Sequence, residues 1–580
     1  MFHDNLGSVD LSNSPMFILS YTTWTELTNC LFRNNTLSKQ PGIIHLEQAD
    51  TLIIRDCVFD STTIESAQYD NGGYSYFINL LVNNDNVILQ NIRITANQST
   101  NGNDFGIGIF AQANESLVAD SIFVINNYEE FEYDKSGQPG CRLFSLGTVE
   151  ASNIYVLNNS ALRSDLNEHP NEHGCARYNL EVRGDVLLEH AEIAFNNNDF
   201  RQDGLGLTID GLYPFNQTVV IRDVTIHDNS WNYESSWAST YGKGSGIISD
   251  VGFIQKIEIE NVHIYNQENT LYAAAIYARA DSLIIKSSHI SDCGNGVIGF
   301  SATDVILENV LVKDCWNNRG LISSHIIEGA IGSSAYISNC TIVDSYADHG
   351  RAVYIGAHYI PDNKTALIEN SIIDNSCPSG SELGYYSEGN IDFVVRYSNI
   401  DGGWEGVGNI DLDPLFTDPE NDDYTFLSDS PCIDAGNPDS AYNDSEDPNH
   451  TGWPLWPSQG TLRNDMGCYG GPGAIDLWDY QDVPVRPQQP VQPETIELFQ
   501  NYPNPFNPTT TIEFTLPYPQ DVQLGVYNVL GQRVAVIANG TYGAGLHRVE
   551  FDGAASPSGI YIYRLNSETD AVAGKMILVR

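Results

Sequence analysis

The segment from Asn167 to Cys175 gathers residue types that bind metal ions. It reads Asn-Glu-His-Pro-Asn-Glu-His-Gly-Cys, so His169 and His173 stand beside two glutamates and a cysteine. Imidazole, carboxylate and thiolate groups are the ligands that Zn²⁺ takes in proteins. Pro170 lies between the histidines and breaks the helix that would place them on one face. We take a solvated loop as the default interpretation and a metal site at His169 and His173 as the competing hypothesis.

Aromatic residues cluster within residues 230–241, where the sequence has Trp231, Tyr233, Trp237 and Tyr241. Sugar rings present apolar C–H faces that stack on such side chains, and ligand sites are often lined by aromatic groups. The alternative is that these rings pack onto the protein's own surface. We interpret the four residues as candidate ligand-binding residues for a glycan.

Two acidic stretches, residues 418–423 and 437–447, are dense in Asp, Asn and Glu. Carboxylate and amide oxygens are the ligands that Ca²⁺ prefers. Neither stretch has the spacing of an EF-hand loop, which requires Gly at position 6 and Glu at position 12. Ca²⁺ is therefore the one cofactor that the sequence suggests, and acidic turns are the simpler interpretation.

The charge balance excludes one class of partner. The chain has 75 acidic and 27 basic residues and a formal charge of −48, so it lacks the basic footprint of a protein that binds nucleic acid. No apolar run is long enough to span a membrane. Residues 1–29 lack a basic start followed by an apolar run, so no signal peptide is recognised. We expect that Met1 is not the true start, or that the sequence is a fragment.

A repeat fills the first four hundred residues and must position any site. Each copy has a few strand-like residues, a small polar residue and a second apolar alternation, as in Val87-Ile-Leu-Gln-Asn-Ile-Arg-Ile94. A period of 20–40 residues without helical periodicity is typical of a β-solenoid. Asn, Asp and Ser suit tight bends, and stacked copies form side-chain ladders. The polar residue falls at Asn29, Asp56, Asn91, Ser121, Asn153, His190, Asp223, Asn261, Ser287, Asn309, Asn339, Asn370 and Ser398.

The repeat predicts an all-β fold, a right-handed parallel β-helix over residues 1–408, because parallel crossovers are right-handed. An array of Ig-like modules would need longer units, which the sequence lacks. The region resembles the pectate-lyase-like superfamily. Polygalacturonases of that fold carry clustered Asp pairs with Gly-His-Gly, and Asp348-His349-Gly350 is the nearest echo here, without its partners. Lyases of the fold use basic residues beside carboxylates. Residues of this kind near the polar positions are Arg55, Arg93, Arg222 and Lys313, which we interpret as solvent-facing strand residues.

Residues 409–480 resemble a choice-of-anchor module, a closing segment that is common on bacterial β-helices. It includes Asp465-Met-Gly-Cys-Tyr-Gly-Gly471. An array needs its open apolar end covered, so we expect the segment to cap the solenoid. Residues 481–494 contain four prolines and predict an extended linker.

The tail, residues 495–580, predicts six or seven short strands and hence a small Ig-like β-sandwich. It opens with Asn501-Tyr-Pro-Asn-Pro-Phe-Asn-Pro508 and ends with Lys575-Met-Ile-Leu-Val-Arg580. In order and in detail it resembles the type A C-terminal sorting domain of the type IX (Por) secretion system. The resemblance implies a partner, the type IX machinery, and a place, secreted from or anchored to the surface of a Gram-negative cell. It also implies a sorting signal at Lys575, Met576, Ile577, Leu578, Val579 and Arg580.

Ten cysteines in 580 residues do not make a disulfide scaffold. Bridges are permitted in an exported protein, so we propose the pairs Cys141 with Cys175 and Cys432 with Cys468, although a sequence does not fix connectivity.

The leading functional hypothesis is an exported β-helix protein that binds a polysaccharide or another extracellular ligand. One alternative is a polysaccharide lyase or glycoside hydrolase acting on acidic polysaccharide, and a second is a structural adhesin stalk. The catalytic residues are unknown, because no nucleophile motif or phosphate loop occurs and carboxylate separations cannot be measured in a sequence. An enzyme needs a basic residue and carboxylates on one exposed sheet face, a binder needs exposed aromatic residues, and a stalk needs neither.

Overall fold

The computed structural model divides the chain into two compact units, Met1–Trp478 and Asp479–Arg580. We call them the body and the C-terminal unit and describe each by itself. The structure describes residues 17–19, 22–33, 36–38, 44–46, 49–60, 63–65, 75–80, 85–102, 105–131, 141–163, 180–198, 206–210, 217–231, 246–267, 275–294, 297–317, 327–347, 351–357, 364–375, 382–387, 391–448, 451–452, 454–455, 457–474, 497–499, 501, 504, 506–516, 520–542, 545–554, 556–567 and 571–579.

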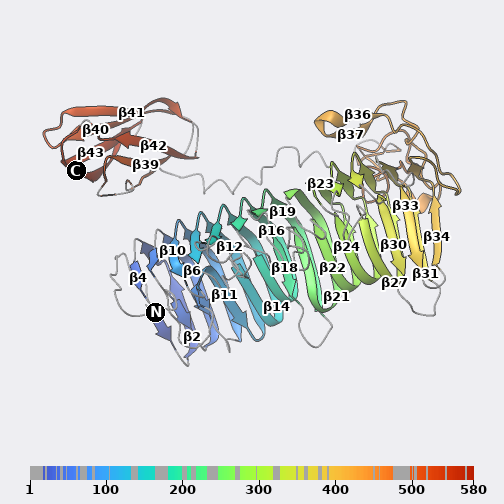
Figure 1. Cartoon of the computed structure of the whole chain (residues 1–580), viewed down its shortest axis with the longest axis horizontal. Coiled ribbons are helices and arrows are strands. Elements are labelled where there is room, and N and C mark those ends of the chain that lie inside the picture. The colour runs from blue at the N-terminus through green and yellow to red at the C-terminus, as the bar shows by residue number, and fades with distance from the viewer. Residues whose placement is uncertain are drawn as a thin grey trace. The chain divides into compact units, whose positions relative to one another are not determined.

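The body is a stack of chain turns, which we call coils, joined by parallel strand pairing (Figure 1). Equivalent residues of successive coils lie opposite one another, so that Leu52 pairs with Val87 and Val87 with Leu117. This register continues coil by coil to Ala366 and Phe393. Because each strand supplies hydrogen-bond partners to the coils on both sides, the backbone polar groups of the inner coils are satisfied. The structure is thus all-β with many parallel strands, as the repeat predicts.

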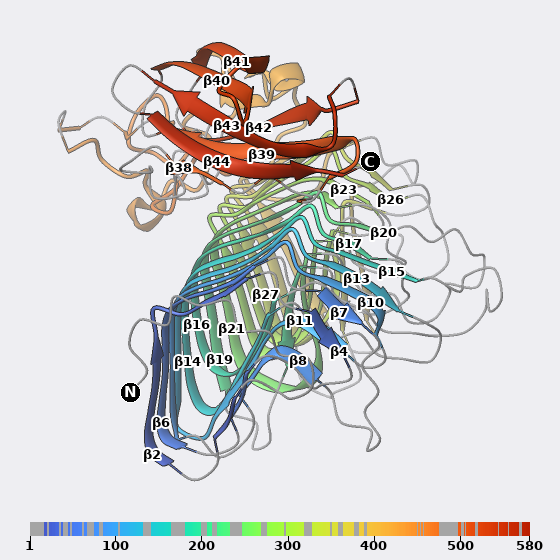
Figure 2. The ribbon, with the colours of Figure 1, turned by 90° about the vertical axis from the view of Figure 1, so that its left-hand side faces the viewer.

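Each coil contributes strands to separate layers, which Figure 2 shows nearly end on. The first layer comprises β1 (Phe17–Leu19), β5 (Ile44–Leu46), β8 (Ser75–Leu80), β11 (Phe105–Ala113), β18 (Leu207–Asp210), β30 (Val353–Ala357), β33 (Leu383–Ser387) and the beginnings of longer strands. Those longer strands continue into the second layer and are β14 (Cys141–Leu157), β16 (Leu180–Ala194), β21 (Ile247–Gln267), β22 (Ile276–Lys286), β24 (Ile298–Glu308) and β27 (Ile327–Ser338).

The second layer also contains β2 (Thr22–Thr28), β3 (Leu31–Arg33), β6 (Ala49–Asp60), β9 (Asn86–Thr95), β12 (Ser116–Ile125), β19 (Gln217–His227), β23 (His289–Cys293), β25 (Leu311–Lys313), β28 (Thr341–Val343), β31 (Lys364–Glu369), β32 (Ile372–Asp374), β34 (Ile391–Arg396) and β35 (Asn399–Ile400). Short strands form a third layer: β4 (Thr36–Ser38), β7 (Thr63–Glu65), β10 (Gln98–Gly102), β13 (Tyr128–Phe131), β15 (Ser160–Arg163), β17 (Asn197–Asn198) and β20 (Ser230–Trp231), with β26 (Trp316–Asn317) and β29 (Tyr346–Ala347) as a separate pair.

The polar residue of the repeat is a corner. From Asn29 to Asn370, all twelve expected positions have φ between 48° and 58°, a left-handed conformation that Asn and Asp tolerate best. The bend expected at Ser398 is instead at Tyr397, with φ 51°. Ser398 is the next residue and points into the coil, where its hydroxyl accepts the N–H of Ser371. In this copy of the repeat the corner therefore lies one residue earlier than predicted.

A second corner follows five residues after the first and was not predicted. It is left-handed at residues as different as Ala96, Asn126 and Phe195. The next residue turns inward, and in five successive coils it is a fully buried asparagine. Between neighbouring coils, the Asn of the earlier coil donates its backbone N–H and its side-chain Nδ2 to the Oδ1 of the Asn in the next coil, at 2.9–3.2 Å. The ladder consists of Asn97, Asn127, Asn159, Asn196 and Asn229.

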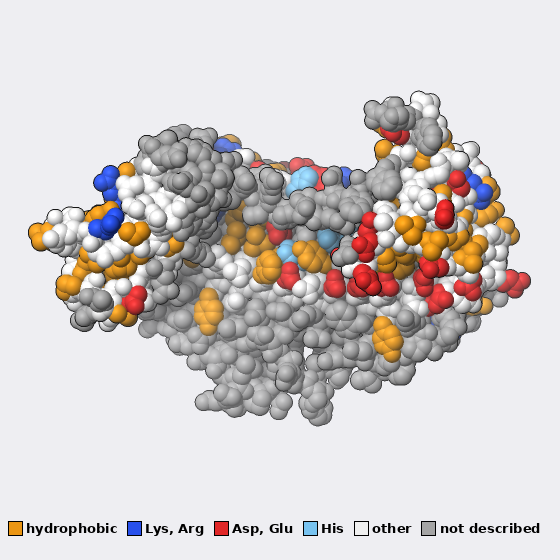
Figure 3. Space-filling view, turned by 90° about the horizontal axis from the view of Figure 1, so that it is seen from above, with side chains coloured by type: hydrophobic (Ala, Val, Ile, Leu, Met, Phe, Trp, Pro, Cys, Tyr) orange, Lys and Arg blue, Asp and Glu red, His pale blue; other side chains and the backbone are white. Residues whose placement is uncertain are grey.

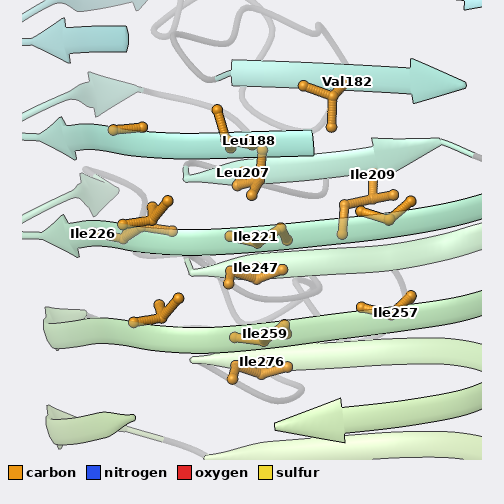
Figure 4. Packing of buried hydrophobic residues seen from close by; sticks show 14 of the residues in the cluster. Val182, Leu188, Leu207, Ile209, Ile221, Ile226, Ile247, Ile257, Ile259 and Ile276 are labelled. Carbon is orange, nitrogen blue, oxygen red and sulfur yellow. The ribbon is translucent and has the colours of Figure 1, made fainter. Parts of the chain in front are cut away.

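The core fills the inside of the stack. Along each strand buried apolar residues alternate with more exposed ones, and Figure 4 shows Ile, Leu and Val side chains of neighbouring coils packed in rows. Leu188, Ile221 and Ile259, for example, stack in successive coils and are completely buried. Burying each such side chain contributes about 2 kcal/mol, so the repeat builds one continuous core.

The closing segment, residues 401–474, is mostly irregular. It contains the antiparallel pair β36 (Phe416–Asp418) and β37 (Asp423–Phe426) and the short 3-10 helices η1 (Pro419–Asn421) and η2 (Ser440–Tyr442). Trp404 packs against the main core at the last coil. The rest lies along the outside of the last coils, where Tyr424, Met466 and Cys468 form a second core with Leu311, Val343 and Ile372. The segment therefore covers a side of the stack as well as its last coil.

The C-terminal unit has two antiparallel sheets that enclose one core. One sheet has the order β38 (Glu497–Leu498), β39 (Thr509–Leu516), β42 (Gly545–Asp552), and the other has the order β41 (Arg533–Tyr542), β40 (Gln520–Asn528), β43 (Gly559–Asn566), β44 (Ala571–Leu578). The strands predicted in the tail are confirmed, and a turn in which Gly531 has φ 75° connects β40 and β41. The peptide bond between Asn507 and Pro508 is cis.

Candidate functional site

Titratable side chains gather on the outer face of the short strand segment between the two corners. Two positions of this segment point away from the core, two and four residues after the first corner. The first position carries Glu192, Thr225, His263 and His289 in successive coils, and the second carries His227, Tyr265, Ser291 and Lys313. We call these eight residues the histidine face. Figure 3 shows His side chains beside acidic and hydrophobic ones on this side of the molecule.

His227 is held between two carboxylates. Its Nε2 lies 3.1 Å from Glu192 Oε1, and its Nδ1 lies 2.7 Å from Asp228 Oδ2. Only the protonated imidazole can donate from both nitrogens. Burial lowers the pKa of His227, but the hydrogen bonds to Glu192 and Asp228 outweigh it and the pKa is raised above its ordinary value. The two carboxylates therefore favour the protonated form of His227, whose side chain is 8% exposed.

The rings of the face stack along the coils. His227 lies on Tyr265 with centroids 4.6 Å apart and planes 9° apart, and His263 lies on His289 at 4.5 Å and 10°. His263 and Tyr265 are also 4.6 Å apart, so the two stacks adjoin. Phe195, at the corner beside His227, meets it edge on at 5.1 Å and is 53% exposed. Stacked rings at this spacing reinforce the coil packing.

The two other histidines are neutral. Burial, with the charges of His227 and Lys313 nearby, lowers the pKa of His263 to about 4. Burial, with His263 and Lys313, lowers the pKa of His289 well below its usual range. Burial, with Asp228 and Glu192, raises the pKa of Tyr265 to about 12. One imidazole with a raised pKa thus stands beside two imidazoles with lowered pKa values, a divergence that is common at sites of acid–base chemistry.

Two buried polar atoms of this face have no hydrogen-bond partner within the described part of the chain. They are Glu192 Oε2 and His289 Nε2. Buried polar groups in folded proteins almost always have partners, so an unpaired one needs an explanation. Here one atom is an acceptor and the other belongs to a neutral imidazole, so a hydroxyl group would satisfy either.

The face ends at Lys313, which sequence reasoning placed in solvent. This interpretation is wrong, because Lys313 is 3% exposed. Its Nζ pairs with Asp314 at 3.0 Å and with Asp422 of the closing segment. Burial lowers the pKa of Lys313, but these two carboxylates raise it overall. The ammonium group therefore fastens the closing segment to the coil and is not available to a ligand.

Arg222 lies before the first corner, on the neighbouring outer face, among three carboxylates. Its Nε is 3.0 Å from Glu260, and its other nitrogens are 3.7 Å from Glu189 and 4.0 Å from Glu258. The group is 39% exposed, so these ion pairs are solvent-screened. The arrangement places a basic residue and carboxylates on one exposed sheet face, but the guanidinium group is already engaged by acids of its own protein.

No metal centre emerges from the described residues, in which no group of three His, Cys, Asp or Glu side chains is arranged to hold an ion. The acidic stretches serve other contacts there: Asp422 pairs with Lys313, and Asp423 accepts the N–H of Thr425. Asp439 caps η2 by accepting the N–H of Ala441. In the same described ranges, no helix is long and apolar enough to cross a membrane.

Most candidate residues from the loops cannot be placed. His169, His173, Cys175, Tyr233, Trp237 and Tyr241 lie outside the described residues, as do Asp348-His349-Gly350 and Arg580. The backbone of Trp231 forms β20, and nothing is described of its side chain. The ligand and metal hypotheses at these positions therefore stay predictions.

The proposed bridge between Cys432 and Cys468 is wrong for this structure, because both are buried free thiols. The Cys432 sulfur instead accepts a hydrogen bond from Asn399 Nδ2 at 3.4 Å. Burial raises the pKa of either thiol to about 12, which makes both unreactive. Cys141 is also a buried free thiol, and its proposed partner Cys175 lies outside the described residues.

The C-terminal unit is organised around its last strand. The N–H of Phe506 donates to Ile577 O at 2.9 Å, and the N–H of Val579 donates to Phe506 O at 3.0 Å. Asn504 Oδ1 accepts the N–H of Ile577 at 2.9 Å. The Pro-rich opening of the tail therefore pairs with β44, which contains most of the predicted signal.

Comparison with known families decides what this unit is. Residues 500–579 match the family described as the secretion system C-terminal sorting domain. This part of the chain is a type IX sorting domain. No curated protein and no solved structure matches the chain. The sorting domain indicates export, with secretion or attachment at the outer cell surface, and implies interaction with the type IX machinery.

Proposed function

We propose that the body binds a neutral glycan at the histidine face after export. In this proposal the body is a right-handed parallel β-helix, the C-terminal unit is an Ig-like sandwich, and Lys575 to Arg580 form the signal that the type IX machinery reads. The two unpaired polar atoms, Glu192 Oε2 and His289 Nε2, carry the proposal. Sugars supply closely spaced hydroxyl groups, which can donate to the first atom and pair with the second.

The rings support the same class of ligand. Phe195 is half exposed beside His227, and an exposed aromatic side chain next to convergent polar groups is typical of carbohydrate sites. His227 Nε2 contacts Glu192 Oε1 at 3.1 Å and so positions the unpaired Oε2 of the same carboxylate.

Electrostatics favour a neutral over an acidic glycan. The formal charge of −48 repels polyanions. Lys313 of the face and Arg222 beside it are each engaged by carboxylates of the protein. A uronic acid polymer would have to displace these partners, which weakens the hypothesis of an enzyme acting on acidic polysaccharide.

Acid–base catalysis on a glycan is the second candidate, because the pKa values of His227 and His263 diverge in opposite directions. In this candidate a proton of His227 would reach the glycan through Glu192, which its Nε2 contacts, and His263 or Tyr265 would orient a hydroxyl group. The stacking distances on Tyr265 place both imidazoles beside the same phenol ring.

The experiment uses the purified full chain and affinity gels cast with neutral or uronic acid polymers. We expect retardation by at least one neutral polymer and its loss in Glu192→Gln with His289→Ala. Glu308→Gln is the matched control, because Glu308 pairs with Lys286 outside this face. Reducing ends and unsaturated-product absorbance test for hydrolysis and elimination. Absence of retardation by every polymer would refute the glycan proposal, and binding only to uronic acid polymers would refute its preference for neutral ones.

A further inference from the structure

The four-stranded sheet of the sorting domain exposes an apolar surface. Sixteen large hydrophobic side chains are exposed among the described residues of the whole chain, and seven of them lie between Val529 and Val579. In β43 the alternation is strict: Ile560 and Ile562 are 45% and 36% exposed, whereas Tyr561 is 4% exposed. An antiparallel sheet with one solvated face normally carries polar residues on that face, so these positions break the expected pattern.

The exposed residues are neighbours across the sheet. Ile562 lies opposite Tyr527 of β40, and Ile560 lies opposite Ile577 of β44. Val536 of β41, 42% exposed, lies opposite Gly525, whose missing side chain leaves room for the ring of Tyr527. We call this set the apolar sheet face; its members are Tyr527, Val534, Val536, Ile560, Ile562 and Ile577.

Basic residues border this face. Arg564 lies opposite Gly525, and Lys575 lies opposite Ile562, both exposed. The four strands contain Arg533, Arg564 and Lys575 but one acidic residue, Asp521. In a chain with 75 acidic and 27 basic residues, a sheet of this composition is exceptional. A partner surface that is apolar at its centre and carries carboxylates at its rim would complement it.

We propose that the apolar sheet face is the surface by which the sorting domain docks on a component of the type IX machinery with such an apolar and acidic site. Contiguous apolar patches on soluble domains mark interaction sites, and the machinery is the partner that a sorting domain implies. The docking surface then extends over β40, β41 and β43, well beyond the last residues of the chain. This proposal is independent of glycan binding by the body.

The test measures export of the full chain in a bacterium that has a type IX system. Ile560→Asp with Ile562→Asp puts two carboxylates on the face, and Arg533→Glu with Arg564→Glu reverses charges at its rim without altering the predicted signal at Lys575 to Arg580. We expect each pair to lower the amount at the surface and in the medium about tenfold, as loss of an interface centre does, with accumulation in the periplasm. Thr509→Asp, at an exposed position of the other sheet, is the control and should be exported normally.

Protease resistance and circular dichroism of each purified chain show whether the domain is folded. If the aspartate pair unfolds the domain, the charge-reversal pair decides, because it leaves the apolar residues in place. Normal export of a folded charge-reversal variant would overturn the proposal. So would concentration-dependent dimerisation of the wild type that the aspartate pair abolishes without affecting export, because the face would then serve a second copy of the chain.

Discussion

The ring of His227 lies face to face with the ring of Tyr265, and the centroids are 4.6 Å apart. The stack fixes the imidazole so that both of its nitrogens meet carboxylates, and the pKa of His227 is raised. A histidine whose folded pKa exceeds its unfolded value of about 6.5 binds its proton more tightly when folded. Its contribution to stability is complete below pH 6.5 and is lost as the pH rises through the folded pKa.

We therefore expect the thermal midpoint of the body to fall as the pH rises from 6 to 9, and this fall to be smaller in His227→Gln. The effect is on the order of 1 kcal/mol for each unit of pKa shift.

His263→Asn tests the opposite dependence of stability on pH. Because burial lowers the pKa of His263 to about 4, the wild type loses stability as the pH falls from 6.5 toward 4, and this variant should lose less. Scanning calorimetry across pH 4 to 9 measures both, and identical profiles for all three chains would contradict the assignments.

The buried asparagine ladder predicts a large effect of one amide. Asn159 Oδ1 accepts from the backbone and side chain of Asn127, and Asn159 Nδ2 donates to Asn196 Oδ1 and Val124 O at 3.0 and 2.9 Å. Asn159→Ala leaves several of these groups buried without partners, which costs about 3 kcal/mol or more. The neighbouring Asn158 is exposed and left-handed, with φ 52°, so Asn158→Gly should change stability by only a few tenths of a kcal/mol.

Hydrogen exchange measured by mass spectrometry distinguishes Asn159→Ala, which alters the ladder, from the control Asn158→Gly. The expected result for Asn159→Ala is lost protection in β12, β14 and β16, with distant coils unchanged, because each coil contacts only its neighbours. Equal protection in both variants would show that the ladder contributes nothing beyond the backbone pairing.

The repeat predicted the first corner because its residue type recurs. Asn, Asp or Ser occupies that position in nearly every copy, and the chemistry of the bend selects those residues. The second corner had a similar signal that was missed, because Asn or Asp occupies seven of its nine left-handed positions, with Ala96 and Phe195 as the exceptions. At those two exceptions the bend is imposed by the inward asparagine and by the neighbouring coils, which the local residue type does not reveal.

The histidine face was missed for a different reason. Glu192, His227, His263 and His289 are 26 to 36 residues apart in sequence, and each lies in a different coil. Aligning the copies on the first corner places them at the same two outward positions, so the signal was present but required exact register. Lys313 was misassigned because its cover comes from Asp422, which is distant in sequence and belongs to an irregular segment.

The closing segment contains a carboxyl that is costly to ionise. Asp444 is 4% exposed, and its Oδ1 accepts the N–H groups of Asp465 and Gly471. Its Oδ2 is buried and has no partner in the described ranges. Burial, with the charge of Asp465 beside it, raises the pKa of Asp444 to about 8. The unfolded chain releases this proton near pH 4, so the folded state loses stability as the pH rises from 4 to 8.

Asp444→Asn keeps the accepting oxygen and removes the ionisation. We expect a higher thermal midpoint than the wild type at pH 8 and a flatter dependence on pH, with little difference at pH 5. Asp429→Asn is the control, because Asp429 is exposed in the same segment, and it should retain the wild-type profile. A lower midpoint for Asp444→Asn at pH 8 would mean that the ionised carboxylate is stabilising.

The contact between Asn504 and Ile577 predicts how the sorting strand is held. Asn504 Oδ1 accepts the N–H of Ile577, and the adjacent Phe506 pairs with the backbone on either side of Leu578. Asn504→Ala removes one of these bonds, a loss of about 1 kcal/mol, and should raise the opening rate of β44 severalfold. Limited proteolysis of the full chain should then remove the last residues faster.

Asn539→Ala is the matched control. It deletes an exposed side-chain bond to Gln523 on β41, a strand that does not pair with β44. Equal cleavage rates in the two variants would show that the Pro-rich opening does not restrain the strand, whereas faster cleavage in Asn504→Ala alone would show that it does.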